Sequence, residues 1–162
     1  MFRPMRRSRQ ELSEQETLEI LARGTSGVLA LAGDDGYPYA VPISYALDGG
    51  RLIFHCAKTG HKMDAINRCG KASFCVIDRD DVVPEKFSTL YRSAIAFGRM
   101  RVLEGQEALE AMEKLAVKYN PEDIGPGRAK EIEGSKGALC VLELCIEHLS
   151  GKQSKALAAA QD

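Results

Sequence analysis

Four consecutive residues, Thr59-Gly60-His61-Lys62, combine the features of a phosphate-binding corner. They follow an apolar segment and precede a helical pattern, so His61 and Lys62 should fall in the first helical turn. A helix start offers unpaired backbone N–H groups and the positive end of the helix dipole, glycine lets a ligand approach closely, and lysine adds a full charge. The chain lacks the GxxxxGK[ST] loop of nucleoside-triphosphate binders, so a merely solvated lysine remains an open alternative.

The predicted strand that leads into this corner carries a histidine, His55. In an extended chain Ile53 and His55 point to one side, while Leu52, Phe54 and Cys56 point to the other, so both faces look covered. A covered histidine needs a hydrogen-bond partner. His55 is therefore either a core histidine satisfied by a backbone carbonyl or a group lining a cofactor or substrate pocket.

Metal and hydrolase chemistry have weaker support. The residues that could hold zinc show no recognisable paired-ligand motif, and most of the thiols fall in apolar, strand-like segments, so no metal site is predicted. Those residues are His55, Cys56, His61, Cys69 and Cys75. The GxSxG elbow of serine hydrolases does not occur.

The elements that must position the corner follow from the pattern around it. Ser13 and Glu16 fit a capping box at the start of a helix over 14–23. Apolar and alternating runs predict strands 27–32, 39–47 and 51–56, joined by two tight turns into an antiparallel meander. Thr59 is the expected N-cap of a helix over 60–68 that stops at Gly70.

Two of the strands carry unusual residues. Pro42 deletes a ladder N–H group and favours an edge or bulge position, and Ser44 beside it could offer polar groups to a planar ligand. The other elements expected are, in order, strand 72–77, surface loop 78–89, strand 91–103, helix 106–119, loop 120–134 with one helical turn near 129–132, strand 137–147 and a loose tail 150–162.

These patterns predict a mainly β (α+β) fold: six strands in an antiparallel barrel or strongly coiled sheet, with peripheral helices. A chain of 162 residues with 44% hydrophobic content suits one domain. The expected organisation is a flexible basic arm over 1–12, the barrel domain over 13–150 and a C-terminal tail over 151–162.

Composition narrows the function classes. A net charge of −1 gives no broad basic field, which argues against nucleic-acid binding. The sequence shows no run of ~18 apolar residues and no signal peptide, so we expect no membrane contact and a cytoplasmic location. Five cysteines without a CxxC pair indicate reduced thiols.

The chain resembles the FMN-binding split β-barrel proteins related to pyridoxamine 5'-phosphate oxidase, and within them the nitroimidazole-resistance branch. Four stretches carry the resemblance: "MRRSRQEL", "YPYAVPISYALDGGRLIFHCAKTGHKMDAI", "YRSAIAFGRMRVLE" and "LCIEHLSGK". They extend from Met5 to Lys152. The oxidase relatives use a more cationic phosphate loop and an arginine-rich C-terminal ending, and neither is clear here, so the resemblance does not extend to vitamin B6 oxidation.

The resemblance implies a homodimer with two FMN sites, each built from both subunits. Lys62 would hold the phosphate with His61, which stands where the oxidase relatives tend to have arginine, and His55 would be the functionally important histidine. Ser93 and Ile95 would come from the partner strand. The implied cofactor-binding residues are Pro42, Ile43, Ser44, His55, Cys56, Ala57, Gly60, His61, Lys62, Met63, Ser93 and Ile95.

The expected function is an FMN-dependent oxidoreductase that takes electrons from a nicotinamide donor such as NAD(P)H and passes them to a small acceptor, with nitroaromatics as candidates. His55 is the candidate catalytic proton donor, since the flavin itself supplies the redox chemistry. The alternative is a barrel that binds FMN or haem for storage or sensing without turnover. A structural dimer with an empty cleft is a third option.

Overall fold

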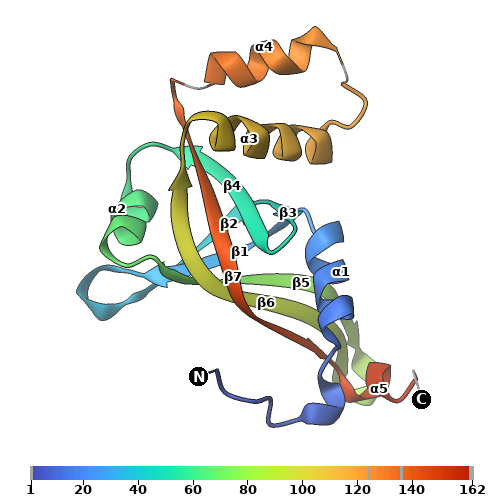
Figure 1. Ribbon diagram of the computed structural model, residues 1–162. Helices are drawn as coiled ribbons and strands as arrows, with labels where there is room; N and C mark the ends of the chain where they lie inside the picture. Colours follow the sequence, from blue (N-terminus) through green and yellow to red (C-terminus); the bar gives the residue numbers. More distant parts are fainter. Residues whose placement is uncertain (1, 124, 136, 161–162) are drawn as a thin grey trace.

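A computed structural model describes residues 2–123, 125–135 and 137–160 (Figure 1). Within these residues, seven strands form one antiparallel sheet with the neighbour order β2-β1-β5-β6-β7-β4-β3. The strands are β1 (Ser26–Ala32), β2 (Pro38–Ser44), β3 (Ala46–Asp48), β4 (Arg51–Ala57), β5 (Lys71–Val83), β6 (Ser88–Leu103) and β7 (Leu139–Gln153).

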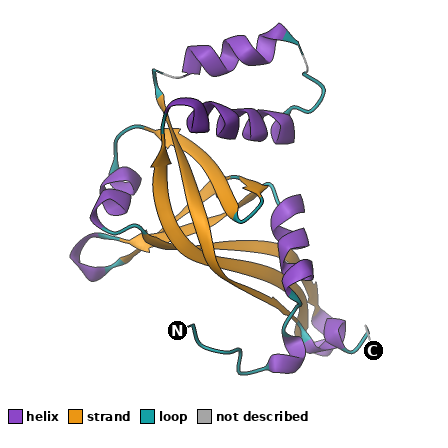
Figure 2. Ribbon diagram, viewed as in Figure 1, coloured by secondary structure: helices purple, strands orange, loops and turns teal. Residues whose placement is uncertain are grey.

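Helices surround this sheet (Figure 2). They are α1 (Glu14–Arg23), α2 (His61–Arg68), α3 (Gly105–Tyr119), α4 (Pro126–Ser135) and α5 (Lys155–Ala158), with short 3-10 turns η1 (Ser8–Gln10), η2 (Asp34–Gly36) and η3 (Pro84–Lys86). None of the helices in the described part of the chain is long and apolar enough to span a membrane.

The sheet curls because its two edge strands are consecutive in the chain. β2 and β3 lie at opposite edges, yet only Tyr45 separates them. Residues two positions apart lie within about 7 Å of each other, so the two edges must meet. The resulting strongly coiled half-barrel confirms the predicted mainly β class with peripheral helices, and Pro42 lies on an edge strand as predicted.

Tyr45 also explains why the structure has seven strands and not six. The sequence predicted one strand over 39–47, but Tyr45 splits it into two strands that pair with β1 and β4 respectively. Both predicted hairpins are present, but they do not form one continuous meander, because β2 and β4 are not hydrogen-bonded neighbours. The Tyr45 side chain is fully buried and its hydroxyl donates to the Leu21 carbonyl at 2.7 Å.

The predicted surface loop over 78–89 is wrong. β5 continues to Val83, η3 reverses the chain, and β6 begins at Ser88, so the two strands form a long hairpin arm. Phe87 closes the turn with a φ of 46°. The polar residues of this arm gave no strand signal because most of their side chains face solvent.

The principal core lies inside the barrel. The rings of Tyr45 and Phe54 each pack edge-on against Phe74, with centroids 4.7 and 5.1 Å from it. α1 covers this core with the buried residues Ile20 and Leu21, and its predicted capping box between Ser13 and Glu16 is present. A second cluster forms outside the barrel, where α3 packs against β3, β4 and β7.

The last third of the chain is more ordered than the sequence predicted. α4 replaces most of the predicted loop over 120–134, and β7 extends to Gln153. The predicted loose tail is wrong as far as Ala158, because Ser154 is buried and caps α5. Gly151 permits this packing: a Cβ atom there would lie 2.1 Å from the Thr17 hydroxyl oxygen of α1. Residues 161–162 of the predicted tail lie outside the described residues.

Candidate functional site

The end of β4 exposes a histidine directly after a buried segment. Leu52, Ile53 and Phe54 are completely buried, whereas His55 and Ala57 are exposed. The expectation that both faces of β4 are covered at His55 is therefore wrong. β3 and α3 cover Ile53, but the imidazole of His55 opens into a cavity of about 380 Å³ bounded by Ser44, α3 and α4.

The surroundings of His55 favour the neutral form of its imidazole. Partial burial, and secondly the positive charge of Lys62, lower the pKa of His55 below its ordinary value. No hydrogen bond or ion pair of the His55 side chain occurs within the described residues. The imidazole can therefore offer both a donor and an acceptor to a ligand.

The turn from β4 into α2 is built on a glycine. Gly60, not Thr59, is the N-cap, and its φ of 115° suits glycine because other residues rarely adopt such an angle. No atom lies within 4 Å of the position where a Cβ atom of Gly60 would stand, so this corner is open. The first helical bond runs from the Asp64 N–H to the Gly60 carbonyl, which leaves the preceding N–H groups of α2 without helical acceptors.

His61 is held by the turn between β1 and β2. Its Nε2 atom lies 3.3 Å from Asp34 Oδ2, and its ring stacks on Tyr39 with the centroids 4.0 Å apart. Arg68 also pairs with Asp34, at 2.8 Å. These contacts fasten the start of α2 to the edge of the sheet, and they limit how freely His61 could turn toward a phosphate.

Lys62 is the available cation of the corner. It is half-buried, and within the described chain it makes no ion pair. Its charge lowers the pKa of both His55 and Cys56, although burial is the larger cause at each side chain. The predicted roles of Lys62, His55 and Cys56 toward a cofactor stay predictions.

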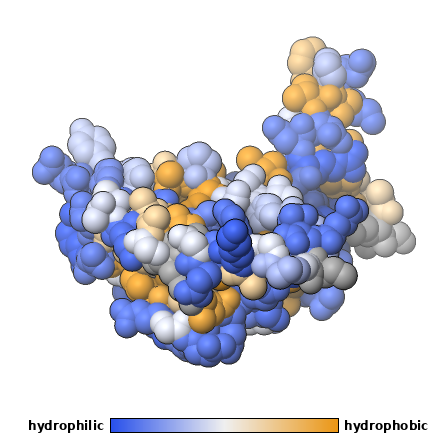
Figure 3. Space-filling model, turned by 90° about the horizontal axis from the view of Figure 1, so that it is seen from above, coloured by the Kyte–Doolittle hydropathy of each residue, from blue (hydrophilic) through white to orange (hydrophobic). Residues whose placement is uncertain are grey.

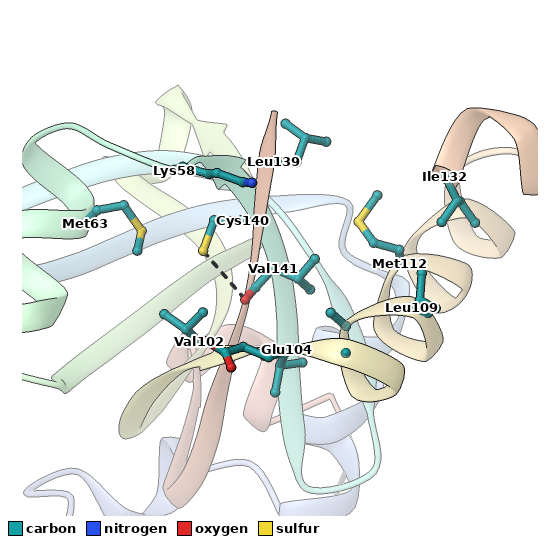
Figure 4. A pocket seen from close by; sticks show the side chains of 13 residues that line it. Lys58, Met63, Val102, Glu104, Leu109, Met112, Ile132, Leu139, Cys140 and Val141 are labelled. Atoms are coloured by element: carbon teal, nitrogen blue, oxygen red, sulfur yellow. Dashed lines mark hydrogen bonds between the residues drawn. The ribbon is translucent and has the colours of Figure 1, made fainter. Parts of the chain in front are cut away.

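A second, larger cavity of about 580 Å³ adjoins this corner (Figure 4). Met63 borders it from α2, Lys58 from the connecting loop and Cys140 from β7. The Met63 side chain is 6% exposed, and its sulfur accepts a contact from Cys56 Sγ at 3.7 Å. Most of the remaining lining is apolar and comes from the end of β6 and from α3.

The other predicted site residues divide into two groups. Ser44 of β2 reaches the His55 cavity, and Pro42 is exposed on the same side of the strand, while Ile43 turns inward against the core. Ser93 and Ile95 lie half-buried on β6, where Lys152 and Ser150 of β7 are their partners. Neither lines a cavity with His55 or Met63 in the described chain.

Several lining residues escaped the sequence analysis. Lys58 stood within the segment already of interest, and its charge could have identified it. Cys140, Met112 and Tyr119 gave no signal, because only the pairing of β4 with β7 and the packing of α3 bring them to the site.

The corner suits a phosphate-bearing cofactor in its chemistry. Free N–H groups at a helix start and an unpaired lysine are the donors that a phosphate monoester requires, and the open space at Gly60 lets such a group approach them. The adjoining apolar cavities suit a flat ring system. Lys62, Gly60 and the first N–H groups of α2 would hold the phosphate, with His55 and Ser44 beside the ring.

Comparison with solved structures identifies the fold. A candidate 5-nitroimidazole antibiotic resistance protein from Bacteroides thetaiotaomicron superposes with a TM-score of 0.72 at 17% identity, covering 88% of this chain and 86% of that one. A conserved hypothetical protein from Mycobacterium tuberculosis gives a TM-score of 0.79 at 18% identity, with 95% and 92% covered. An FAD- and haem-binding protein from Mycobacterium smegmatis gives 0.74 at 24% identity, with 94% and 80% covered.

The family assignment has a separate basis. Curated proteins yielded no match to this chain. The family model described as pyridoxamine 5'-phosphate oxidase, however, matches residues 13–153, which include every strand of the sheet. This protein therefore belongs to the pyridoxamine 5'-phosphate oxidase family.

Proposed function

We propose that this protein binds FMN at a site shared by two copies of the chain and acts as an oxidoreductase toward a small acceptor. The observation that carries the proposal is the open helix start at Gly60, with the half-buried Lys62 in the first turn of α2 and His55 on the strand that leads into it. Family membership supports flavin binding, as do the flavin-binding proteins among the similar structures. A nicotinamide donor is part of the proposal.

The residues of the site have distinct roles in this proposal. When bound, a flavin supplies reversible electron transfer. Lys62 neutralises the phosphate, α3 and α4 exclude water from the His55 cavity, and His55 holds a proton near the reacting ring. Because the pKa of His55 is lowered, its charged form requires a lower pH than an ordinary histidine does. If that form donates the proton, turnover increases as the pH falls.

The distance between His55 and Ser93 within one chain supports a shared site. Val141 is the register partner of both His55 and Leu103, so these two residues lie at the same level of the sheet. Ser93 is ten residues along β6 from Leu103. This separation is about 33 Å along the strand at ~3.3 Å per residue, further than one mononucleotide reaches. Ser93 could join the site only from a second copy.

The β5–β6 arm offers a surface for that second copy. Ile77, Val82 and Phe87 are 68%, 70% and 100% exposed, and exposed apolar side chains of this size are typical of interfaces. Apolar patches also interrupt the hydrophilic surface seen from above (Figure 3).

Reconstitution with FMN or FAD, followed by absorbance, tests the cofactor. We expect FMN to bind, and Lys62→Ala to weaken binding roughly 10- to 150-fold, as loss of a charge-assisted hydrogen bond worth ~1.5–3 kcal/mol implies. Lys155→Ala, an exposed lysine of α5, is the matched control and should leave affinity unchanged. Equal flavin affinity of the wild-type protein and Lys62→Ala would exclude the proposed phosphate site.

Steady-state turnover of the loaded protein with NADH or NADPH tests the role of His55. We expect His55→Gln to retain flavin but to lower turnover about 10²- to 10⁴-fold, the usual contribution of general acid catalysis. Flavin that binds but is never reduced by either donor would instead identify a storage or sensing module.

A further inference from the structure

Two of the five cysteines, all of which lie in the described chain, stand directly opposite each other in the sheet. Cys56 of β4 is the register partner of Cys140 of β7. Residues directly opposite in an antiparallel pair have Cα atoms about 4.5–5.5 Å apart, within the ~4.4–6.8 Å that a disulfide bridges. Cys69, Cys75 and Cys145 have no cysteine as a strand partner.

The two thiols also share one face of the sheet. Both side chains are half-buried and pack against the same barrel core, as opposite residues in a sheet must. Side chains directly opposite each other in an antiparallel pair have Cβ atoms about 4.5–5.5 Å apart, so the two thiols are neighbours. The Met63 sulfur lies 3.7 Å from Cys56 Sγ.

Each thiol has a nearby lysine, and one thiol opens to a cavity. Burial raises the pKa of both cysteines, but Lys62 opposes this at Cys56 and Lys58 opposes it at Cys140. Cys140 lines the 580 Å³ cavity together with Lys58, so a small oxidant can reach it (Figure 4). The lysines favour the thiolate, which is the form that reacts.

We propose that Cys56 and Cys140 form a reversible disulfide between β4 and β7 when the protein meets a peroxide. The Cys140 thiolate attacks one peroxide oxygen, the O–O bond breaks, and the other oxygen leaves as water after protonation. The Cys56 thiol then attacks the sulfenic sulfur, forms the S–S bond and releases a second water. Two thiols are thus oxidised by two electrons and one peroxide is reduced to two waters.

The test treats the full-length protein, without added flavin, with hydrogen peroxide and then alkylates the remaining thiols under denaturing conditions. We expect two fewer of the five thiols to be alkylated, and dithiothreitol to restore them. Non-reducing tryptic digestion should yield peptide 52–58 linked to peptide 137–152. Because peptide 137–152 also contains Cys145, the Cys145→Ser variant is the control and should give the same linkage.

Cys56→Ser, Cys140→Ser and the corresponding alanine variants should each abolish the linked peptide, and circular dichroism should confirm that the variants tested are folded. Five alkylated thiols after peroxide treatment, a linkage through Cys145, a disulfide between two chains or oxidation to sulfinic acid would each overturn the proposal. The wild-type digestion requires no variant, so it decides the matter even if the substitutions impair folding.

Discussion

Removal of one hydroxyl group should measurably weaken the junction where the barrel closes. Tyr119 of α3 reaches the break between β2 and β3, where its Oη atom lies 2.9 Å from both the N and the O atom of Tyr45 and also contacts the Thr25 carbonyl. Tyr45 is fully buried, so after Tyr119→Phe its N–H group would lack an acceptor. Such a loss costs about 1–3 kcal/mol of the free energy of unfolding.

Urea denaturation and thermal unfolding measure this cost. For a chain of this size, about 1–3 kcal/mol corresponds to a melting temperature lowered by roughly 2–12 °C. Tyr37→Phe is the matched control, because Tyr37 is 76% exposed, and it should leave the melting temperature unchanged. If Tyr119→Phe is as stable as the control within about 0.5 kcal/mol, the hydroxyl does not support the break as argued.

Two further predictions concern packing and pH. Gly98→Ala should destabilise the protein by about 3 kcal/mol or more, since its Cβ atom would lie 1.9 Å from the Cys145 carbonyl oxygen, whereas Gly50→Ala, with open space, should cost under ~0.5 kcal/mol in the same urea titration. The hydrogen bond from Arg51 lowers the pKa of Asp48 in the folded protein. The ionised Asp48 therefore stabilises the fold at pH values above about 4, the pKa of an aspartate in the unfolded chain, and this stabilisation is lost as the pH falls and the carboxylate is protonated. In Asp48→Asn the free energy of unfolding should therefore decrease less steeply as the pH falls below about 4. The same decrease in the variant as in the wild-type protein would contradict this.

Local chemistry made much of the fold predictable. The capping box at Ser13 and the apolar stripe of 106–119 specify helices through neighbouring residues alone, and both helices are present. The apolar run over 27–32 and the tight turn before 51–56 likewise located β1 and β4. The split at Tyr45 was not predictable, because the hydroxyl that stabilises it belongs to Tyr119, far along the chain.

The candidate site shows the same division. The segment from His55 to Lys62 was predicted as a site from the sequence because its histidines, glycine and lysine are close together in the chain and chemically distinctive. Its second half, Cys140 and the lining of α3, depends on which strand pairs with β4. Gly60 displaced Thr59 as the N-cap because the turn demands a positive φ, a requirement that a preference for threonine does not reveal.

The pairing of β4 with β7 has a consequence for synthesis in the cell. β4 and the start of α2 leave the ribosome early, but the strand that fixes them is translated only after α3 and α4. Until then the nascent chain can form the β1–β2 and β3–β4 hairpins but not the corner itself. Capture of the proposed flavin should consequently be a late, largely post-translational event, and prematurely terminated chains should emerge colourless.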